Sequence, residues 1–486
     1  MKTGYSELML VGHQLAVPVA LMFLYKGIHM PSFTGIIFVI LLSASLVAPV
    51  QAAESKPVRY VVLGENGVQM ARVITPDAQC PLIQFDGQKV RMDVRAKPAS
   101  LPGRAGKPSV FPLLACEKKI PAHTMHVAVD HIELPLLPSV VNRIVVIGDT
   151  GCRLKRGDGA YQACNDDNLY PFSRIAAAAA SWKPDLVIHV GDLLYRESPC
   201  PQDHPECKGS PWGYGFDAWQ ADFFAPGEAL LKAAPWVLVR GNHESCSRAG
   251  QGWWRMMDAR PLQPGRDCND VANDDKGDYS DPYAVPLGND AQLIVMDTSN
   301  TLEKPIPAGD MRGLKYRDLY HKLEKLTQQA SYNIVADHHP ILGFSAEQDK
   351  QDVVTLLPGN RGIQSVFGAI NPQFLPSRID VLLSGHVHAW QQVSFSSSHP
   401  TQFVTGFSGT MEDPVALPAK MPLDATPAPG AVVEHLSSWA GGFGYMTMER
   451  KGPQQWEARV WDVNGKIRNT CMIEGRHSVC DQARIE

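Results

Sequence analysis

Side chains that commonly bind metal ions follow short apolar runs at five places in the sequence. Each run has the length and composition of a buried strand, and the polar residues that come after the runs are Asp149, Asp192, Tyr195, Asn242, His338, His386 and His388. A carboxylate at the end of a buried strand is costly unless a cation meets it. A hard, highly charged metal ion prefers carboxylate, phenolate and imidazole ligands. Five strands that end at one edge of a sheet would therefore gather these side chains around one or two ions.

Asp192 lies in the central motif, and a single carboxylate placed between two ions can bridge them. Two ions about 3.5–4 Å apart can clamp a phosphoryl oxygen and acidify a bound water. His386 and His388 would point the same way on a regular strand, but a turn at Gly385 could aim them at separate ions. The net charge of −5 gives no basic surface for a nucleic-acid backbone. A phosphate site would therefore draw its positive charge from bound metal, with a small phosphorylated substrate as the expected partner.

The five motifs resemble those of the calcineurin-like metallophosphoesterases and are most similar to those of purple acid phosphatases. They occur in order between Asn142 and His388, as GD-x-G, GD-x-x-Y, GNHE, V-x-x-H and GH-x-H. Many relatives carry a histidine two residues after the first aspartate, whereas this chain has Gly151 there and gains Tyr195. In purple acid phosphatases this exchange accompanies a ferric ion held by the phenolate. The resemblance implies an α/β fold, a two-sheet β sandwich flanked by helices.

The resemblance also implies roles for individual residues. The ferric site would use Asp149, Asp192, Tyr195 and His388. The divalent site, for Fe, Zn or Mn, would use Asp192, Asn242, His338 and His386. His243 would face the substrate and stabilise the transferring phosphoryl group or protonate the leaving oxygen. The implied reaction is hydrolysis of phosphate monoesters by in-line attack of a metal-bound hydroxide. Residues expected to support the ligands or line the substrate pocket are Arg240, Glu244, Asp337 and His339.

Each motif alone has an ordinary structural explanation, such as a capping aspartate or a core histidine, and only the ordered set of five favours metal binding. Two other functions stay open. One is a phosphodiesterase or nucleotide-cleaving enzyme that uses divalent metals, and the other is a non-catalytic surface-binding protein whose metals brace the fold. His243 and Glu244 count against the second, because a purely structural site needs neither. A nearby aromatic cluster is expected to pack rather than to contact substrate: Trp212, Tyr214, Trp253 and Trp254.

Residues 1–52 are expected to be a signal peptide and not part of the fold. Ile36 to Ala48 is an apolar run too short to span a bilayer comfortably, and Val50-Gln51-Ala52 suits signal peptidase. The stretch Leu8 to Tyr25 is also apolar, so Met22 or Met30 is a candidate start, and a membrane-anchored helical hairpin is the alternative. Removal of the segment predicts a periplasmic or secreted protein with no stable membrane span in the mature chain.

The 486 residues exceed what one core usually organises. Residues 55–138 show short alternating runs divided by Pro and Gly, which predict a small antiparallel β domain. Residues 140–486 alternate strands with helices, expected at 172–182, 216–232 and 314–328, and form the predicted catalytic domain. Two loop-like insertions are expected at 196–215 and 412–433, where substrate specificity usually resides.

The ten cysteines fit an exported protein. Sequential pairing is the simplest arrangement, although connectivity cannot be deduced from a sequence and several could be free and buried. The sequential pairs are Cys80 with Cys116, Cys152 with Cys164, Cys200 with Cys207, Cys246 with Cys268, and Cys471 with Cys480.

Overall fold

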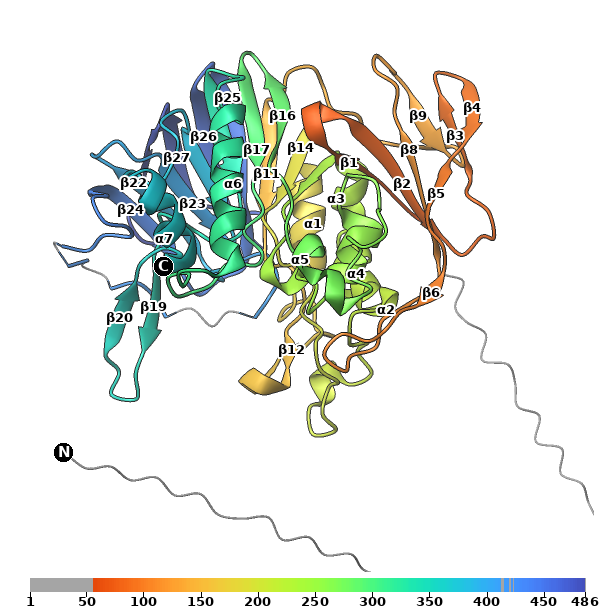
Figure 1. Ribbon diagram of the computed structural model, residues 1–486, viewed down its shortest axis with the longest axis horizontal. Helices are drawn as coiled ribbons and strands as arrows, with labels where there is room; N and C mark the ends of the chain where they lie inside the picture. The colour runs from red at the N-terminus through yellow and green to blue at the C-terminus, as the bar shows by residue number, and fades with distance from the viewer. Residues whose placement is uncertain (1–55, 412–414, 419–420, 423, 486) are drawn as a thin grey trace, which may run out of the picture. The chain divides into compact units, whose positions relative to one another are not determined.

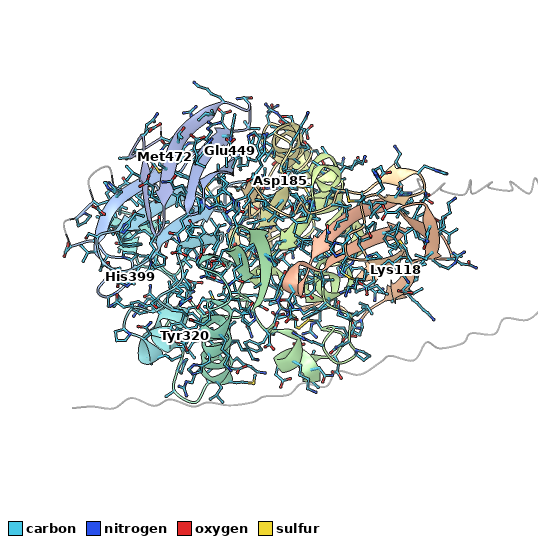
Figure 2. All side chains as sticks on the ribbon, turned by 90° about the horizontal axis from the view of Figure 1, so that it is seen from above. Lys118, Asp185, Tyr320, His399, Glu449 and Met472 are labelled. Atoms are coloured by element: carbon cyan, nitrogen blue, oxygen red, sulfur yellow. A yellow bond between two sulfur atoms is a disulfide. The ribbon has the colours of Figure 1, made fainter. Side chains whose placement is uncertain are left out.

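Two large β-sheets organise the chain, whose computed structural model describes residues 56–411, 415–418, 421–422 and 424–485. The first sheet has eleven strands. In spatial order they are β28 (His477–Cys480), β27 (Ile467–Glu474), β26 (Gln455–Asp462), β25 (Gly444–Gly452), β11 (Arg143–Ile147), β14 (Leu186–His189), β15 (Trp236–Leu238), β1 (Val58–Leu63), β2 (Gln69–Thr75), β8 (Leu114–Lys119) and β5 (Asp93–Ala96). Met472 on β27 and Lys118 on β8, which are near the two edges of this sheet, lie at opposite sides of Figure 2.

The second sheet has seven strands. In spatial order they are β16 (Tyr283–Gly288), β17 (Ala291–Val295), β18 (Tyr332–Ala336), β21 (Val381–Ser384), β23 (Thr401–Thr405), β22 (Trp390–Phe395) and β24 (Val433–Trp439). Strands β17, β18, β21 and β23 run parallel to one another, and antiparallel strands complete both edges.

The two sheets pack face to face over one apolar core, because alternate residues of a strand point to opposite faces. Ile144 and Val146 of β11 pack in this core with Ile334 of β18. Val145 and Ile147 belong to a separate cluster on the other face of the first sheet. The α/β two-sheet sandwich that the sequence resemblance implies is therefore confirmed.

Helices cover the outer faces of both sheets (Figure 1). Helices α1 (Phe172–Ser181) and α3 (Glu228–Ala233) pack on the first sheet, and α6 (Met311–Leu326) and α7 (Arg361–Ile370) pack on the second. The apolar face of α1 repeats every three to four residues, through Phe172, Ile175, Ala176 and Ala179. Asp310 begins α6 by accepting from the Arg312 N–H at 2.9 Å.

The predicted helices at 172–182 and 314–328 are confirmed by α1 and α6. The predicted helix at 216–232 is interrupted before Gly227. It consists of α2 (Phe216–Trp219), a π-helical turn η4 (Gln220–Phe224) and α3. The remaining α-helices are single turns, α4 (Gly250–Gly252) and α5 (Asp274–Gly277).

Strands from residues 58–119 continue the first sheet. β1 pairs in parallel with β15, and β2, β8 and β5 extend the sheet beyond β1 in antiparallel order. A separate four-stranded sheet contains β10 (Ile132–Glu133), β9 (Val127–Val129), β3 (Leu82–Phe85) and β4 (Gln88–Arg91). Strands from residues 55–138 and from residues 140–486 share the first sheet, so this sheet does not separate the two predicted domains. The division at these bounds stays a prediction.

Three short hairpins complete the strands. They are β6 (Ala99–Ser100) with β7 (Val110–Phe111), β12 (Leu154–Lys155) with β13 (Ala160–Tyr161), and β19 (Ser345–Gln348) with β20 (Val354–Leu357). Most of the predicted insertion at 196–215, and the described residues within 412–433, have no regular secondary structure before β24 begins.

Five disulfides join the cysteines in the sequential pairs. Cys471 and Cys480 lie opposite each other on β27 and β28, so this bond links neighbouring strands. The pairing that the sequence left open is therefore settled as the sequential one.

The predicted signal segment at 1–52 lies outside the described residues, as do residues 412–414 of the second insertion. Over the part of the chain that the structure describes, no helix has the length and apolarity needed to cross a membrane.

A buried charged network joins the first strands to the segment that follows the helical turn η6 (Trp253–Met257). Arg72 and Arg95 both pair with Glu117, at 3.1 and 2.7 Å. The two guanidinium groups also donate to backbone carbonyls at the end of that turn, including Met256 O from Arg72 at 2.5 Å and Trp254 O from Arg95 at 2.6 Å. Cations are favourable at this end of a helix, where carbonyls lack partners.

Removing the carboxylate of Glu117 should weaken this network strongly. In Glu117→Ala two buried guanidinium groups lose their counter-charge, and we expect the free energy of unfolding to fall by about 3–5 kcal/mol. Glu133→Ala, at an exposed position of β10, should change it by less than about 0.5 kcal/mol. Urea denaturation followed by tryptophan fluorescence measures both, and equal stability of the two variants would contradict this role of Glu117.

Candidate metal centre

The candidate metal ligands lie after the carboxyl ends of parallel strands. In the first sheet, β11, β14 and β15 are adjacent and parallel, and Asp149, Asp192 and Asn242 follow their ends. In the second sheet, β18 and β21 are adjacent and parallel, and His338 and His386 follow theirs. Because parallel strands end at the same edge, the two sheets deliver these side chains to one place.

Sharp backbone turns aim three of these residues. Asp149, Asp192 and His386 have φ values of 54°, 57° and 68°, in the left-handed region that residues other than glycine rarely adopt. Gly191 has a φ of 101°, and a Cβ at this position would lie 2.5 Å from the Nδ1 atom of His338, so only glycine fits. Strained backbone of this kind typically occurs at functional sites.

A first group of side chains surrounds the phenol oxygen of Tyr195. This oxygen lies 2.9 Å from Asp149 Oδ1, 2.9 Å from Asp192 Oδ2 and 2.9 Å from His388 Nε2. A phenol has one proton and can donate to only one of these atoms. Two carboxylates and a phenol that are all buried make an arrangement that a cation would stabilise. The four residues that the resemblance assigns to a ferric ion are thus brought together.

A second group shares Asp192 with the first. His338 Nε2 lies 3.2 Å from Asp192 Oδ2 and 3.0 Å from Asn242 Oδ1. His386 Nδ1 lies 3.2 Å from the same Asn242 oxygen. His338 donates its Nδ1–H to the carbonyl oxygen of Val190 at 2.9 Å, which leaves Nε2 free to bind an ion. The same oxygen of Asp192 borders both groups, so it is placed to bridge two ions.

The ionisable groups at the centre have strongly shifted pKa values. Burial lowers the pKa of His338, but the carboxylates of Asp192 and Asp149 outweigh it and raise the pKa to about 10. Burial raises the pKa of Asp192, whereas His338 and His243 hold it well below its usual range. Burial and the two carboxylates raise the pKa of Tyr195 well above its usual value. Metal ligands must be deprotonated, so ion binding here would release protons.

Glu244 fixes the loops that carry two of the ligands. Its Oε2 accepts from the N–H groups of Asp192 and Gly241, both at 3.1 Å, and its Oε1 accepts from Leu193 and Leu194 at 2.8 and 3.1 Å. Burial and the nearby Asp192 raise the pKa of Glu244 to about 8. Glu244 thus contacts the backbone of Asp192, and its predicted supporting role stays a prediction.

The other three predicted supporting residues lie in different surroundings. The His339 ring packs against His386, with centroids 4.2 Å apart, and can join His338 and His386 in a group of three possible ligands. Asp337 accepts from the Ser384 hydroxyl, and burial raises its pKa to about 7. Arg240 pairs with Asp297 at 2.6 Å and donates to the backbone carbonyl of Gly277, and its predicted supporting role stays a prediction.

His243 lies beside the first group, within a network that the sequence did not reveal. Its ring packs against that of Tyr195 at a tilt of 37° with centroids 3.8 Å apart, and its backbone N–H donates to Asp192 Oδ1 at 2.8 Å. Arg248 Nη2 lies 2.7 Å from His243 Nε2, and Arg248 Nε donates to Glu197 Oε1 at 2.6 Å. Burial and Arg248 together lower the pKa of His243.

Lys107 connects this network to the N-terminal strands. Its ammonium group lies 3.1 Å from Glu197 Oε2 and 2.9 Å from the Tyr214 hydroxyl. The three new residues sit in loops with no motif of their own, and the only sequence signal was the position of Arg248 four residues after Glu244. Three of the four aromatic residues that are expected to pack are buried: Tyr214, Trp253 and Trp254.

Comparison with known proteins agrees with this geometry. The calcineurin-like phosphoesterase family matches residues 142–390, about half of the sequence and the part that holds nearly all of the site. The chain belongs to the calcineurin-like phosphoesterase family.

This phosphoesterase also resembles two solved structures in fold. The structure of purple acid phosphatase PPD1 from yellow lupin (Lupinus luteus) seeds has a TM-score of 0.55 and 14% identity, covering 86% of this chain and 74% of that chain.

A structure of PhoD has a TM-score of 0.51 and 12% identity, and the match covers 88% of this phosphoesterase and 91% of that chain. At such low identity both likenesses show the fold alone. No curated protein matches the sequence.

The geometry predicts a distinct metal content for each ligand variant. We expect the protein reconstituted with iron and zinc to hold two ions per chain, counted by native mass spectrometry. Asp192→Ala should lose both ions, because Asp192 borders both groups, whereas His388→Ala should lose one. His435→Ala, at an exposed position of β24, is the control and should keep two. An Asp192→Ala protein that keeps both ions would contradict the shared role of Asp192.

Proposed function

We propose that this calcineurin-like phosphoesterase hydrolyses phosphate monoesters with one ferric and one divalent ion. The observation that carries the proposal is the phenol oxygen of Tyr195, which lies 2.9 Å from atoms of Asp149, Asp192 and His388. A phenolate, two carboxylates and an imidazole form a donor set suited to a hard trivalent ion. Asn242, His338 and His386 supply an amide oxygen and imidazoles on the other side of Asp192, which suits a divalent ion.

Two ions bound at these groups would polarise a phosphoryl oxygen and acidify a water molecule. The chain's own residues hold the remaining machinery in place. Asp192 lies between the groups, and Glu244 fixes its backbone through the N–H bonds described above. Preorganised polar groups of this kind need little rearrangement during the reaction.

His243 is placed to handle the proton of the leaving group. Its Nδ1 lies 3.1 Å from the carbonyl oxygen of Leu194, and its Nδ1 and Nε2 each lie 2.7 Å from Arg248 Nη2. An imidazole can take up or release a proton near neutral pH, which suits the role proposed for His243. Glu197 holds Arg248 next to His243, so both residues can contact the oxygens of a phosphoryl group.

Export to the periplasm or to the cell exterior is part of the proposal. Five disulfides support an oxidising compartment, because disulfides are rare in most cytosolic proteins. The apolar segment with a signal-peptidase pattern before residue 53 supports the same conclusion.

The activity is tested with two chromogenic esters. The metal-loaded protein should hydrolyse 4-nitrophenyl phosphate with a higher kcat/KM than bis(4-nitrophenyl) phosphate. His243→Ala should lower kcat about 10²–10⁴-fold, because a positioned proton donor is lost, while mass spectrometry still finds two ions. His435→Ala is the control and should retain wild-type kcat. A preference for the diester would favour the phosphodiesterase alternative, and unchanged kcat in His243→Ala would remove this residue from the mechanism.

The ferric assignment is tested by absorption spectroscopy. A phenolate bound to ferric iron should give a visible charge-transfer band in the purified protein. Tyr195→Phe should abolish the band and leave the divalent ion bound, because Tyr195 contacts only the first group of ligands. A colourless wild-type protein that is fully active with zinc or manganese alone would contradict the ferric assignment.

A further inference from the structure

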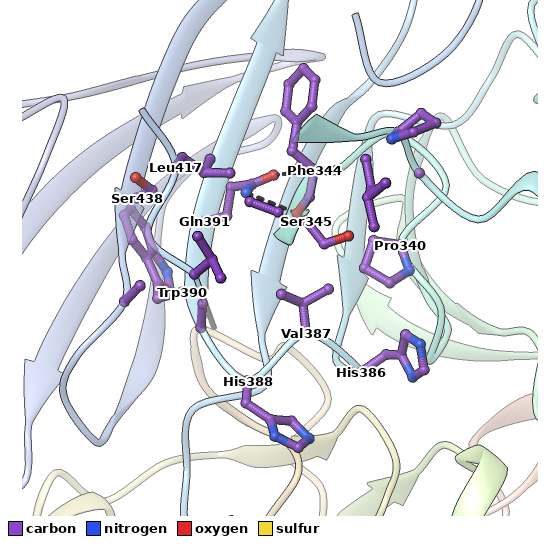
Figure 3. Close-up of a pocket in the computed structure, with 18 of the residues that line it drawn as sticks. Pro340, Phe344, Ser345, His386, Val387, His388, Trp390, Gln391, Leu417 and Ser438 are labelled. Atoms are coloured by element: carbon purple, nitrogen blue, oxygen red, sulfur yellow. Dashed lines mark hydrogen bonds between the residues drawn. The ribbon is translucent and has the colours of Figure 1, made fainter. Parts of the chain in front are cut away.

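A cavity of about 260 Å³ adjoins the candidate metal centre. His386 and His388 lie at one end of it, and Phe344, Leu417 and Ser438 lie at the other (Figure 3). Because proposed ligands of both ions form part of its wall, a phosphoryl group bound at the centre can extend the rest of its molecule into this cavity. Its volume is slightly below the usual range for ligand pockets, so it suits a small group.

The walls combine aromatic side chains with negative charge. Phe344, Trp390 and Trp439 line the cavity and are at most 6% exposed. The charged side chains of the lining, histidines aside, are the carboxylates of Glu303 and Glu347, and no Lys or Arg is among the described lining residues. Such walls favour an apolar group and oppose an anionic one, since an unpaired like charge costs binding energy.

We propose that this cavity binds the leaving group of the substrate and selects neutral arylalkyl or aryl alcohols. The inference rests on the proposed hydrolysis of phosphate esters and adds a substrate class to it. Substrates whose leaving group is anionic, such as the anhydride pyrophosphate, or a polyol, such as glycerol phosphate, are disfavoured by the acidic and apolar walls.

Binding of two non-hydrolysable analogues tests the cavity without requiring turnover. Benzylphosphonate and methylphosphonate share the phosphonate group and differ in the ring, and calorimetry on the metal-loaded protein measures both. We expect benzylphosphonate to bind at least 10-fold more tightly, because even one buried methylene is worth about that factor. Similar affinities for the two analogues would overturn the proposal.

A variant that fills the cavity tests whether the ring of benzylphosphonate binds there. Ser345 lines the cavity and is only partly buried, so Ser345→Trp can fill the space without disturbing the core. The ratio of the two affinities should fall below about threefold. Ser396→Trp, at an exposed position outside the lining, is the matched control and should keep the wild-type ratio. A ratio unchanged in Ser345→Trp would place the ring elsewhere and overturn the proposal.

Turnover of benzyl phosphate and glycerol 1-phosphate separates this inference from the proposed function. Both are esters of primary alcohols, so their rates differ mainly through binding of the leaving group. We expect kcat/KM to be at least 10-fold higher for benzyl phosphate. Equal values would overturn the cavity's role and leave the phosphatase activity intact. No turnover of any ester would contradict the proposed function, whereas the phosphonate affinities would still decide whether the cavity binds the ring.

Discussion

Two carboxylates and a phenol oxygen are buried together at one point, and this costly arrangement explains most of the surrounding structure. Asp149 and Asp192 are at most 1% exposed, and both carboxylates touch the phenol oxygen of Tyr195. Without a cation, two such carboxylates repel each other and lose their hydration, which costs several kcal/mol per charge. The fold is therefore best understood as a support that keeps these groups together for ions that make the arrangement favourable.

The backbone, and not the flexible part of each side chain, sets where the candidate ligands lie. Parallel strands of two packed sheets end at one edge, and abrupt left-handed turns at Asp149, Asp192 and His386 redirect the chain there. Glu244 then holds the loop after β14 to the loop after β15 through four backbone N–H groups. These hydrogen bonds hold the two loops, and with them the ligand side chains, in fixed positions. The same rigidity places His243 against the ring of Tyr195.

Much of this could be predicted from the sequence, because the signals are local. Five apolar runs, each followed by side chains that commonly bind metals, together indicate Asp192 and the other ligands, and the family resemblance of these motifs implies the sandwich with helices outside. What could not be predicted depends on contacts between distant residues. Arg240, for example, pairs with Asp297, 57 residues away. Lys107 reaches Glu197 from 90 residues away, and the pairing of β1 with β15 is likewise non-local. No short motif encodes any of these contacts.

Asp192 Oδ2 lies 2.9 Å from the Tyr195 phenol oxygen and 3.2 Å from His338 Nε2, so it could bind an ion on either side. Anomalous diffraction from crystals of the metal-loaded protein, collected at the iron and zinc absorption edges, tests this shared role. We expect one iron peak next to Tyr195 and one zinc peak next to His338, about 3.5–4 Å apart, with Asp192 as a ligand of both. A single peak, or two peaks too far apart for Asp192 to reach both, would contradict it.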